Sequence, residues 1–269
     1  MSRQQVYDAQ QRRKAITIAS LSTLAVFVVL ATLIPMAPGW PAVKTSFFNA
    51  EVFVKTAPKL LQAFLVDIAI FAWSAPLIAL VGLAIALCRS ARTPTLFPLR
   101  IFGALYVDIF RGIPVVLVIY LVGFGIPGLG LPRPWNSPYI WGTVALVLTY
   151  SAYVAEILRS GIDSIHKSQR SAAVCLGLSD RDVMRFVILP QAIRRVVPAN
   201  MNMVVALQKD VALLSFIGPV EILRQAGVFK SLLANFTPYV VAAVIFLCVT
   251  IPATRYADYL MNRAQNERS

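Results

Sequence analysis

The stretch SQRSAAVCLGLSDRDVMRFVILPQ, residues 168–191, differs from the apolar sequence on either side of it. Good helix formers run from Gln169 to Leu176, and Gly177 follows at the position where a left-handed residue commonly ends a helix. Ala172 and Ala173 leave one side of this helix narrow, so another surface can approach it closely. The pattern predicts a short helix that ends in a tight glycine turn.

A second helix is predicted directly after the turn. Ser179 can cap it, with Asp182 three residues later making a return contact similar to a capping box. Its apolar face follows the i, i+3, i+4 spacing, at Val183, Phe186 and Val187. Pro190 is expected to end or kink this helix.

The flanking sequence has the composition of a membrane protein. Only 14% of the 269 residues are charged and the mean hydropathy is +0.71, whereas soluble domains carry about 25% charged residues. About 20 apolar helical residues cross a bilayer core. Five tracts approach or exceed this length: 16–36, 60–87, 101–125, 139–157 and 238–254. A sixth, 196–220, is interrupted by Lys209 and Asp210. The sequence therefore predicts an all-α integral membrane protein with about six transmembrane helices.

The charge distribution indicates the orientation of the chain. With six spans and an internal N-terminus, 17 of the 25 Lys and Arg residues fall in inner segments and six in outer segments. Lys and Arg are enriched on the cytoplasmic side of membrane proteins. The net charge of +13 therefore indicates the topology of the chain rather than binding to nucleic acid. Both termini are expected in the cytoplasm. The first tract is longer than the apolar region of a signal peptide, so we expect it to be a retained span.

Several kinds of chemistry are not supported by the sequence. His166 is the only histidine, and the three cysteines lack C-x-x-C spacing, so no metal site is expected. The string GFGIPG, residues 123–128, follows an apolar span and opens no helix, which is not the context of a dinucleotide site. No P-loop motif occurs, so the chain itself is not expected to bind and hydrolyse ATP in the usual way.

The segment SAAVCLG…VILP resembles the signature loop of the permease subunits of ABC importers. The family pattern is E-A-A, three residues, G, nine residues, I, one residue, L-P, and the spacing matches throughout, with Ser171 in place of Glu and Val187 in place of Ile. The strings YVDIFRGIPVVLVIYLV, AYVAEILRSGI, VILPQAIRRVVPANMN and LQKDVALLSFIG narrow the resemblance to the polar amino acid uptake branch, which includes the His, Gln, Glu and Arg permeases. It covers about residues 46–262.

The resemblance implies a type I ABC importer permease fold with a coupling helix between spans 4 and 5. It implies two copies of a cytoplasmic ATPase subunit that bind ATP and Mg, a second permease subunit, identical or different, and an extracytoplasmic solute-binding protein. No cofactor is expected on this chain. The chain is then divided into a cytoplasmic tail (1–15), a first transmembrane helix (16–38), an extracytoplasmic interfacial segment (39–59), the permease domain (60–262) with the signature loop at 165–192, and a cytoplasmic tail (263–269).

The resemblance also assigns residues to the contact with the ATPase. The expected coupling residues are Gln169, Ser171, Ala172, Ala173, Leu176, Gly177, Leu178, Asp182, Leu189 and Pro190. A Glu at the position of Ser171 could pair with a base on the ATPase, whereas serine offers only a neutral hydrogen bond. The partner surface is expected to differ to match, or the contact to be weaker.

Ionisable and polar groups within the spans are candidates for the transport path, because charges in the hydrocarbon region are costly and usually face an interior or a cavity. The candidates are Asp67, Glu156, Asn202, Lys209 and Asp210. Lys209 and Asp210 interrupt a tract that must cross the membrane, and broken spans often line a cavity. The alternative role for these groups is structural support of the bundle.

Two pairs at i, i+3 spacing favour a structural role. Asp108 with Arg111, and Glu156 with Arg159, are expected to form ion pairs on the surfaces of their helices. Asp67 could favour a cationic solute if it faces the cavity, or could pair with a base of another subunit.

The resemblance implies an importer permease in the bacterial inner membrane that moves a polar or charged amino acid, or an analogue, with energy from a separate ATPase. The alternative is a self-sufficient secondary transporter with Asp67 or Glu156 as a proton relay. That alternative predicts paired broken spans in both halves of the chain, and the sequence shows one clear broken tract.

Overall fold

The computed structural model describes residues 3–90 and 94–266 as a helical protein, with no strand among these residues. Its elements in chain order are α1 (Arg3–Met36), α2 (Trp40–Phe47), α3 (Ala50–Ser90), η1 (Pro94–Leu96), α4 (Phe97–Gly112), α5 (Val115–Gly125), η2 (Pro127–Leu129), α6 (Pro138–Asp163), α7 (Lys167–Cys175), α8 (Asp180–Asp182), η3 (Val183–Ile188), α9 (Leu189–Asp210), η4 (Val211–Ile217), α10 (Ile222–Leu233) and α11 (Thr237–Asn266).

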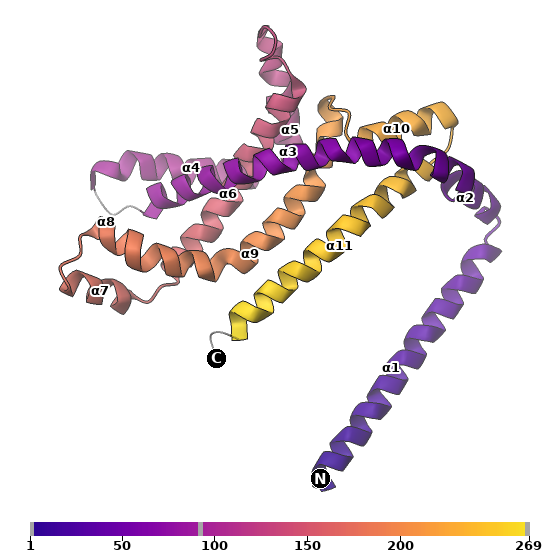
Figure 1. The fold of residues 1–269 in the computed structure, drawn as a ribbon, viewed down its shortest axis with the longest axis horizontal. Coiled ribbons are helices and arrows are strands. Elements are labelled where there is room, and N and C mark those ends of the chain that lie inside the picture. Colours follow the sequence, from indigo (N-terminus) through magenta and orange to yellow (C-terminus); the bar gives the residue numbers. More distant parts are fainter. Residues whose placement is uncertain (1–2, 91–93, 267–269) are drawn as a thin grey trace.

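The bundle is organised around α3, which α6, α9 and α11 cross (Figure 1). The segment from α7 to η3 lies at one end of the bundle and α2 and α10 lie at the other. Buried apolar side chains of α3, α6 and α9, among them Ile78, Leu146 and Leu207, form the largest core cluster. A smaller cluster joins α3 to α10 and α11 through residues such as Phe64 and Ile222.

The helices contain four segments long and apolar enough to cross a membrane: Lys14–Met36, Trp40–Ser90, Pro138–Asp163 and Thr237–Leu260. Two further pairs of helices meet the same test together but are bent, by 106° between α4 and α5 and by 51° before α10. The chain thus offers four candidate spans, or up to six if each bent pair is one span.

The bend between α4 and α5 corrects one expectation from the sequence. The tract 101–125 is a broken pair, so the chain has two broken tracts and not one. Pro114 lacks a backbone N–H and disfavours helical geometry in the residue before it. Ile113 is accordingly extended, with φ −99° and ψ 131°, and α5 restarts after Pro114. Helix α3 also begins at Ala50, within the segment that was expected to be interfacial.

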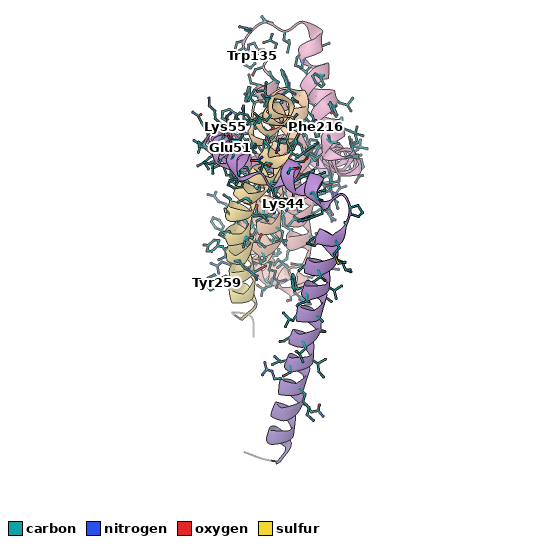
Figure 2. All side chains as sticks on the ribbon, turned by 90° about the vertical axis from the view of Figure 1, so that its right-hand side faces the viewer. Lys44, Glu51, Lys55, Trp135, Phe216 and Tyr259 are labelled. Carbon is teal, nitrogen blue, oxygen red and sulfur yellow. The ribbon has the colours of Figure 1, made fainter. Side chains whose placement is uncertain are left out.

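Helix α1 stands apart from the bundle (Figure 1). No residue in the most hydrophobic part of its candidate span is buried. Figure 2 shows it extending beyond the rest of the molecule, with Trp135 at one end of the structure and Tyr259 towards the other. Its link to the bundle is α2, whose last turn is tied to the start of α11: Phe236 N donates to Ser46 O (2.7 Å), and the Phe47 and Phe236 rings stack.

Helices α3 and α6 approach closely at Gly82. A Cβ atom at this position would lie 2.7 Å from Val154 Cγ1 and 3.1 Å from the backbone oxygen of Ser151. We expect Gly82→Val to lower the free energy of unfolding by about 1 to 3 kcal/mol, because the backbone of α6 must move away. Thermal unfolding in detergent checks this. Gly125→Val is the control, since nothing lies within 4 Å of its Cβ position, and equal melting temperatures of the two variants would contradict the prediction.

Candidate functional site

The turn after α7 has the geometry that the sequence predicts. Gly177 is left-handed, with φ +81°. Its N–H donates to Val174 O (2.9 Å) and the N–H of Leu178 donates to Ala173 O (3.2 Å). These are the two hydrogen bonds of a Schellman motif, which satisfies the last carbonyls of the helix. At the other end, His166 Nδ1 accepts from Ser168 N (3.2 Å) and caps α7.

Ser179 caps the second helix as expected. Its Oγ accepts from Asp182 N (3.3 Å) and lies 2.6 Å from Asp182 Oδ2. The return contact is therefore made between the two side chains rather than to the backbone N–H of Ser179.

Two details of this second helix correct the sequence-based expectations. Residues 183–188 form a π-helix, η3, in which a turn contains more residues than an α-helical turn. Val183 and Ile188 are consequently buried, whereas Phe186, which was expected on the apolar face, is 63% exposed. The helical path also continues through Pro190 into α9, and Gln191 Nε2 donates to Val187 O (2.8 Å).

The two-helix loop is fastened to the bundle by its own apolar cluster. Ala173 of α7 and Val183 and Ile188 of η3 pack with Ile162 and Ile165 at the end of α6. Ala192 of α9 completes the contact. The loop is therefore in direct apolar contact with the end of α6 and the start of α9.

Several apolar side chains of the loop are exposed. Val174, Leu176 and Phe186 are 51%, 82% and 63% exposed. Among the predicted coupling residues, Gln169, Ser171, Ala172 and Pro190 are also exposed, Leu178, Asp182 and Leu189 are half-buried, and Ala173 is buried. We call Val174, Leu176 and Phe186 the apolar knobs of the loop.

Glu156 joins three helices near the start of this region. It accepts from Arg89 of α3 (2.6 Å) and Arg159 of α6 (2.6 Å), and Arg111 of α4 lies 3.7 Å from it. The expected Glu156–Arg159 pair is present, but the expected Asp108–Arg111 pair is not, because Arg111 turns towards Glu156 and leaves Asp108 exposed. Arg159 also bonds Asp163 (2.7 Å).

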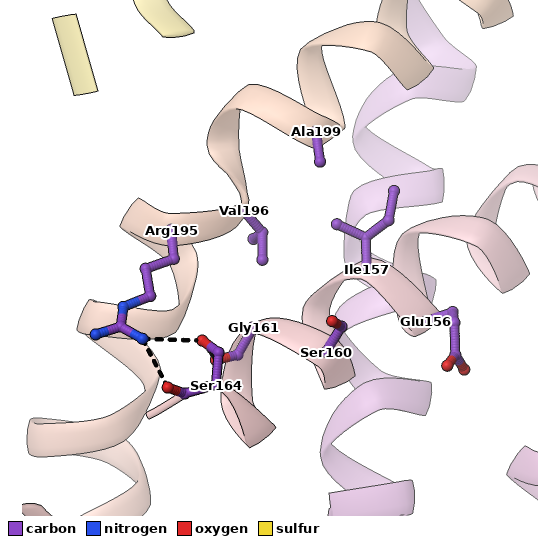
Figure 3. A pocket seen from close by; sticks show the side chains of 8 residues that line it. All are labelled: Glu156, Ile157, Ser160, Gly161, Ser164, Arg195, Val196 and Ala199. Carbon is purple, nitrogen blue, oxygen red and sulfur yellow. Dashed lines mark hydrogen bonds between the residues drawn. The ribbon is translucent and has the colours of Figure 1, made fainter. Parts of the chain in front are cut away.

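A cleft of about 770 Å³ opens between α6 and α9 beside Glu156 (Figure 3). Arg195 crosses from α9 to α6, where its Nη1 donates to Ser164 O (2.6 Å) and lies 3.2 Å from Ser164 Oγ. The lining residues are Glu156, Ile157, Ser160, Gly161, Ser164, Arg195, Val196 and Ala199. The cleft has a carboxylate and a guanidinium on opposite sides, with small residues between them.

Lys209 and Asp210 end α9, but the bend of this span lies farther along the chain, between Ile217 and Ile222, and not at the charged pair as the sequence suggested. α9 ends at Asp210 and continues as the 3₁₀ segment η4. Asp210 Oδ2 accepts from Tyr150 OH of α6 (2.8 Å), so this carboxylate points into the bundle. Lys209 is exposed and shares its helix face with Asn202, also exposed, at seven-residue spacing. The structure thus separates the candidates: Asn202 and Lys209 face outward and Asp210 buttresses α6.

Asp67 is 2% exposed and lies against the start of α10. Its Oδ2 accepts from Ile222 N (3.1 Å). The role of Asp67 in a transport path stays a prediction, and the structure gives it a backbone partner from a neighbouring helix.

Sequence reasoning missed three residues of this region: Arg89, Tyr150 and Arg195. Each bonds a group more than 30 residues away in the chain, so no local spacing indicates the contact. An apolar cavity of about 260 Å³ between α3, α6 and α9, which Tyr150 and Asn200 also line, was likewise not expected. No cluster of three or more potential metal-binding side chains occurs in residues 11–12, 14–90 and 94–260.

Comparisons with known proteins give the context of this geometry. Residues 96–266 match the family described as binding-protein-dependent transport system inner membrane component. The chain is 36% identical over 186 residues to the probable glutamine ABC transporter permease protein GlnM of Bacillus subtilis, covering 68% of this chain and 83% of that one. It is 31% identical over 201 residues to the arginine transport system permease protein ArtQ of the same organism, covering 73% and 88%.

Solved structures share the fold. A chain in the crystal structure of an amino acid ABC transporter with histidines superposes with a TM-score of 0.70 at 30% identity, covering 78% of this chain and 96% of that one. A chain of the MetNI methionine ABC transporter, at 19% identity and a TM-score of 0.60, shares the fold alone. The chain therefore belongs to the family of binding-protein-dependent transport system inner-membrane components.

Proposed function

We propose that this chain is the membrane-spanning subunit of an ABC importer that moves a polar or charged amino acid, or a close analogue, across the bacterial inner membrane. A separate ATPase, present in two copies, supplies the energy, and a solute-binding protein delivers the solute. A second permease subunit pairs with this one. Both termini lie in the cytoplasm. The names of the relatives, which include glutamine and arginine permeases, support the substrate class.

The observation that carries the proposal is the construction of the two-helix loop. Its apolar knobs are exposed, while other residues of the loop pack on α6 and α9. An exposed apolar patch on a rigid element fits a docking surface for a partner protein. Movement of that partner is passed to α6, and from Glu156 on α6 to α3 and α4. This is a mechanical path from an ATPase to the spans.

The exposed face of α9 supports a transport path between two permease subunits. Arg195, Asn202 and Lys209 lie at seven-residue spacing and are exposed, although α9 is part of a bent pair with spanning character. Polar side chains at membrane depth usually face water or another protein subunit rather than lipid. A second permease placed against this face would enclose the polar stripe.

A pull-down tests the docking surface. We expect Leu176→Asp to reduce the amount of P-loop ATPase that co-purifies with the tagged chain about tenfold or more, because a carboxylate would be buried against an apolar partner. The comparison uses native membranes, mild detergent and quantitative mass spectrometry. Leu176 is 82% exposed, so the substitution leaves the fold intact.

Leu129→Asp is the matched control for this experiment. Leu129 is 77% exposed and lies in η2, away from the loop. Its variant should retain the ATPase to within about twofold of the wild-type amount. Wild-type chain that captures no ATPase, or equal capture by the two variants, would overturn the proposal.

A further inference from the structure

Two carboxyl groups meet at the first turn of α10. Glu221 is fully buried and caps this helix, since its Oε2 accepts from Leu223 N (2.8 Å) and its Oε1 from Arg224 N (2.7 Å). Asp67, from the middle of α3, accepts a hydrogen bond from the N–H of Ile222, which directly precedes these two donors in the chain. Two acids thus share three successive backbone donors of one helix, which brings both carboxyl groups to the same turn.

One oxygen of this arrangement lacks a partner. Asp67 Oδ1 is buried and accepts no hydrogen bond. Buried polar oxygens nearly always accept a hydrogen bond, so a buried carboxylate oxygen without a donor requires an explanation. A proton carried by the neighbouring carboxyl would supply the missing hydrogen bond, and it would also remove one of two like charges from a site with little water.

No base is available to neutralise the pair instead. Among the ion pairs whose side chains the structure describes, in residues 11–12, 14–90 and 94–260, none includes Asp67 or Glu221. The bases on the surrounding elements are directed elsewhere: Arg224 Nη1 lies 3.5 Å from Ser215 O, Lys230 lies over the Phe236 ring, Arg100 lies over the Phe97 ring, and Lys59 and Lys209 are exposed. The other acids are also accounted for. Asp210 accepts from Tyr150, Glu156 pairs with Arg89, Arg111 and Arg159, and Asp108 is exposed. α11 carries no charged residue before Arg255.

We propose that Asp67 and Glu221 form a proton-binding site, in which one shared proton joins the two carboxyl groups and holds the start of α10 against α3. The N-terminal turn of α10 stabilises the single remaining negative charge. Loss of the proton would place two charges side by side in the interior and loosen α10. The site thereby couples the position of this helix to pH.

The sign of the pH dependence follows from proton counting. In the unfolded chain both carboxyls are ionised from neutral pH upward, whereas the folded chain retains one proton at this site. The folded state therefore binds more protons, and its stability falls as the pH rises. One proton per chain corresponds to a decrease in melting temperature of about 3 to 5 °C for each pH unit.

The test is the melting temperature of the full chain, purified with its co-purifying subunits in nanodiscs, from mildly acidic to mildly alkaline pH. In Asp67→Asn the amide N–H donates permanently to Glu221, while its oxygen still accepts from Ile222 N. We expect this variant to lose the alkaline decrease and to be at least as stable as wild type at the highest pH. Asp108→Asn, which removes an exposed carboxyl on α4, should keep the wild-type slope.

Infrared spectroscopy provides a second readout that reports the proton itself. The wild-type spectrum should contain the carbonyl band of a buried, protonated carboxylic acid. The band should be absent in Asp67→Asn and in Glu221→Gln, and present in Asp108→Asn. A slope that persists in Asp67→Asn, a wild-type spectrum without the band, or a melting temperature that depends on Na⁺ or K⁺ at fixed ionic strength would overturn the proposal. None of these measurements depends on transport.

Discussion

Replacing Glu156 with glutamine is expected to lower the free energy of unfolding by about 2 to 4 kcal/mol, because it leaves three guanidinium groups without their common acceptor. Arg89 is the most affected, since its side chain is only 13% exposed and Glu156 is its ion-pair partner. The three cations of α3, α4 and α6 would also repel one another. Helices that Glu156 now joins would separate at this end of the bundle.

Thermal unfolding of the purified chain checks this expectation, with a decrease of about 5 to 10 °C for Glu156→Gln. Asp163→Asn is the control, because Asp163 is 60% exposed and makes a single ion pair with Arg159, so its loss should cost less than about 1 kcal/mol. The double variant Arg89→Gln with Glu156→Gln should recover part of the loss. Equal melting temperatures of Glu156→Gln and Asp163→Asn would show that the cluster is not structural.

Replacing Lys209 with methionine is expected to reduce solute uptake into proteoliposomes about tenfold or more, while ATPase co-purification stays at the wild-type level. The ammonium group is exposed at the end of α9 and forms no ion pair in the described part of the chain. Its neighbour Asp210 is engaged by Tyr150. An exposed cation in the last turn of α9, within a broken span, is placed to receive a carboxylate of the solute.

The control for this experiment is Lys59→Met, which removes another exposed lysine from the first part of α3. Its uptake should remain within about twofold of wild type. The loss caused by Lys209→Met should be larger for a solute with net negative charge than for a zwitterion. Uptake by Lys209→Met that equals that of Lys59→Met would exclude Lys209 from the path.

Local features of the fold were predictable where one residue type determines the backbone. Gly177 ends α7 because its conformation is strained for other residues. The tract that contains Lys209 and Asp210 is broken as expected, but its bend lies between Ile217 and Ile222 rather than at the two charges. The bend at Pro114 obeys an equally local rule. The bend was not predicted, because residues 101–125 are largely apolar and were therefore interpreted as one continuous span despite Pro114.

The candidate site was less predictable because its contacts are tertiary. Helical spacing pairs Asp108 with Arg111, yet the stronger acceptor for Arg111 is Glu156 on another helix. The i, i+3 rule placed Phe186 on the buried face, but a π-helix shifts the register by about one residue. Asp67 meets Glu221 across 154 positions of the chain, and no spacing rule reaches that far.

The detachment of α1 has a consequence for the order of assembly. Its candidate span has no buried residue, and hydrogen bonds tie α2, which joins it to α3, to residues 235–236 before α11, near the end of the sequence. During synthesis α1 is made long before α11, so as a candidate span it must be stable in the bilayer without these contacts, and its predominantly apolar sequence meets that condition. The anchoring of α2 is then among the last folding events, and α1 stays free to diffuse in the lipid around its tether until the final helix arrives.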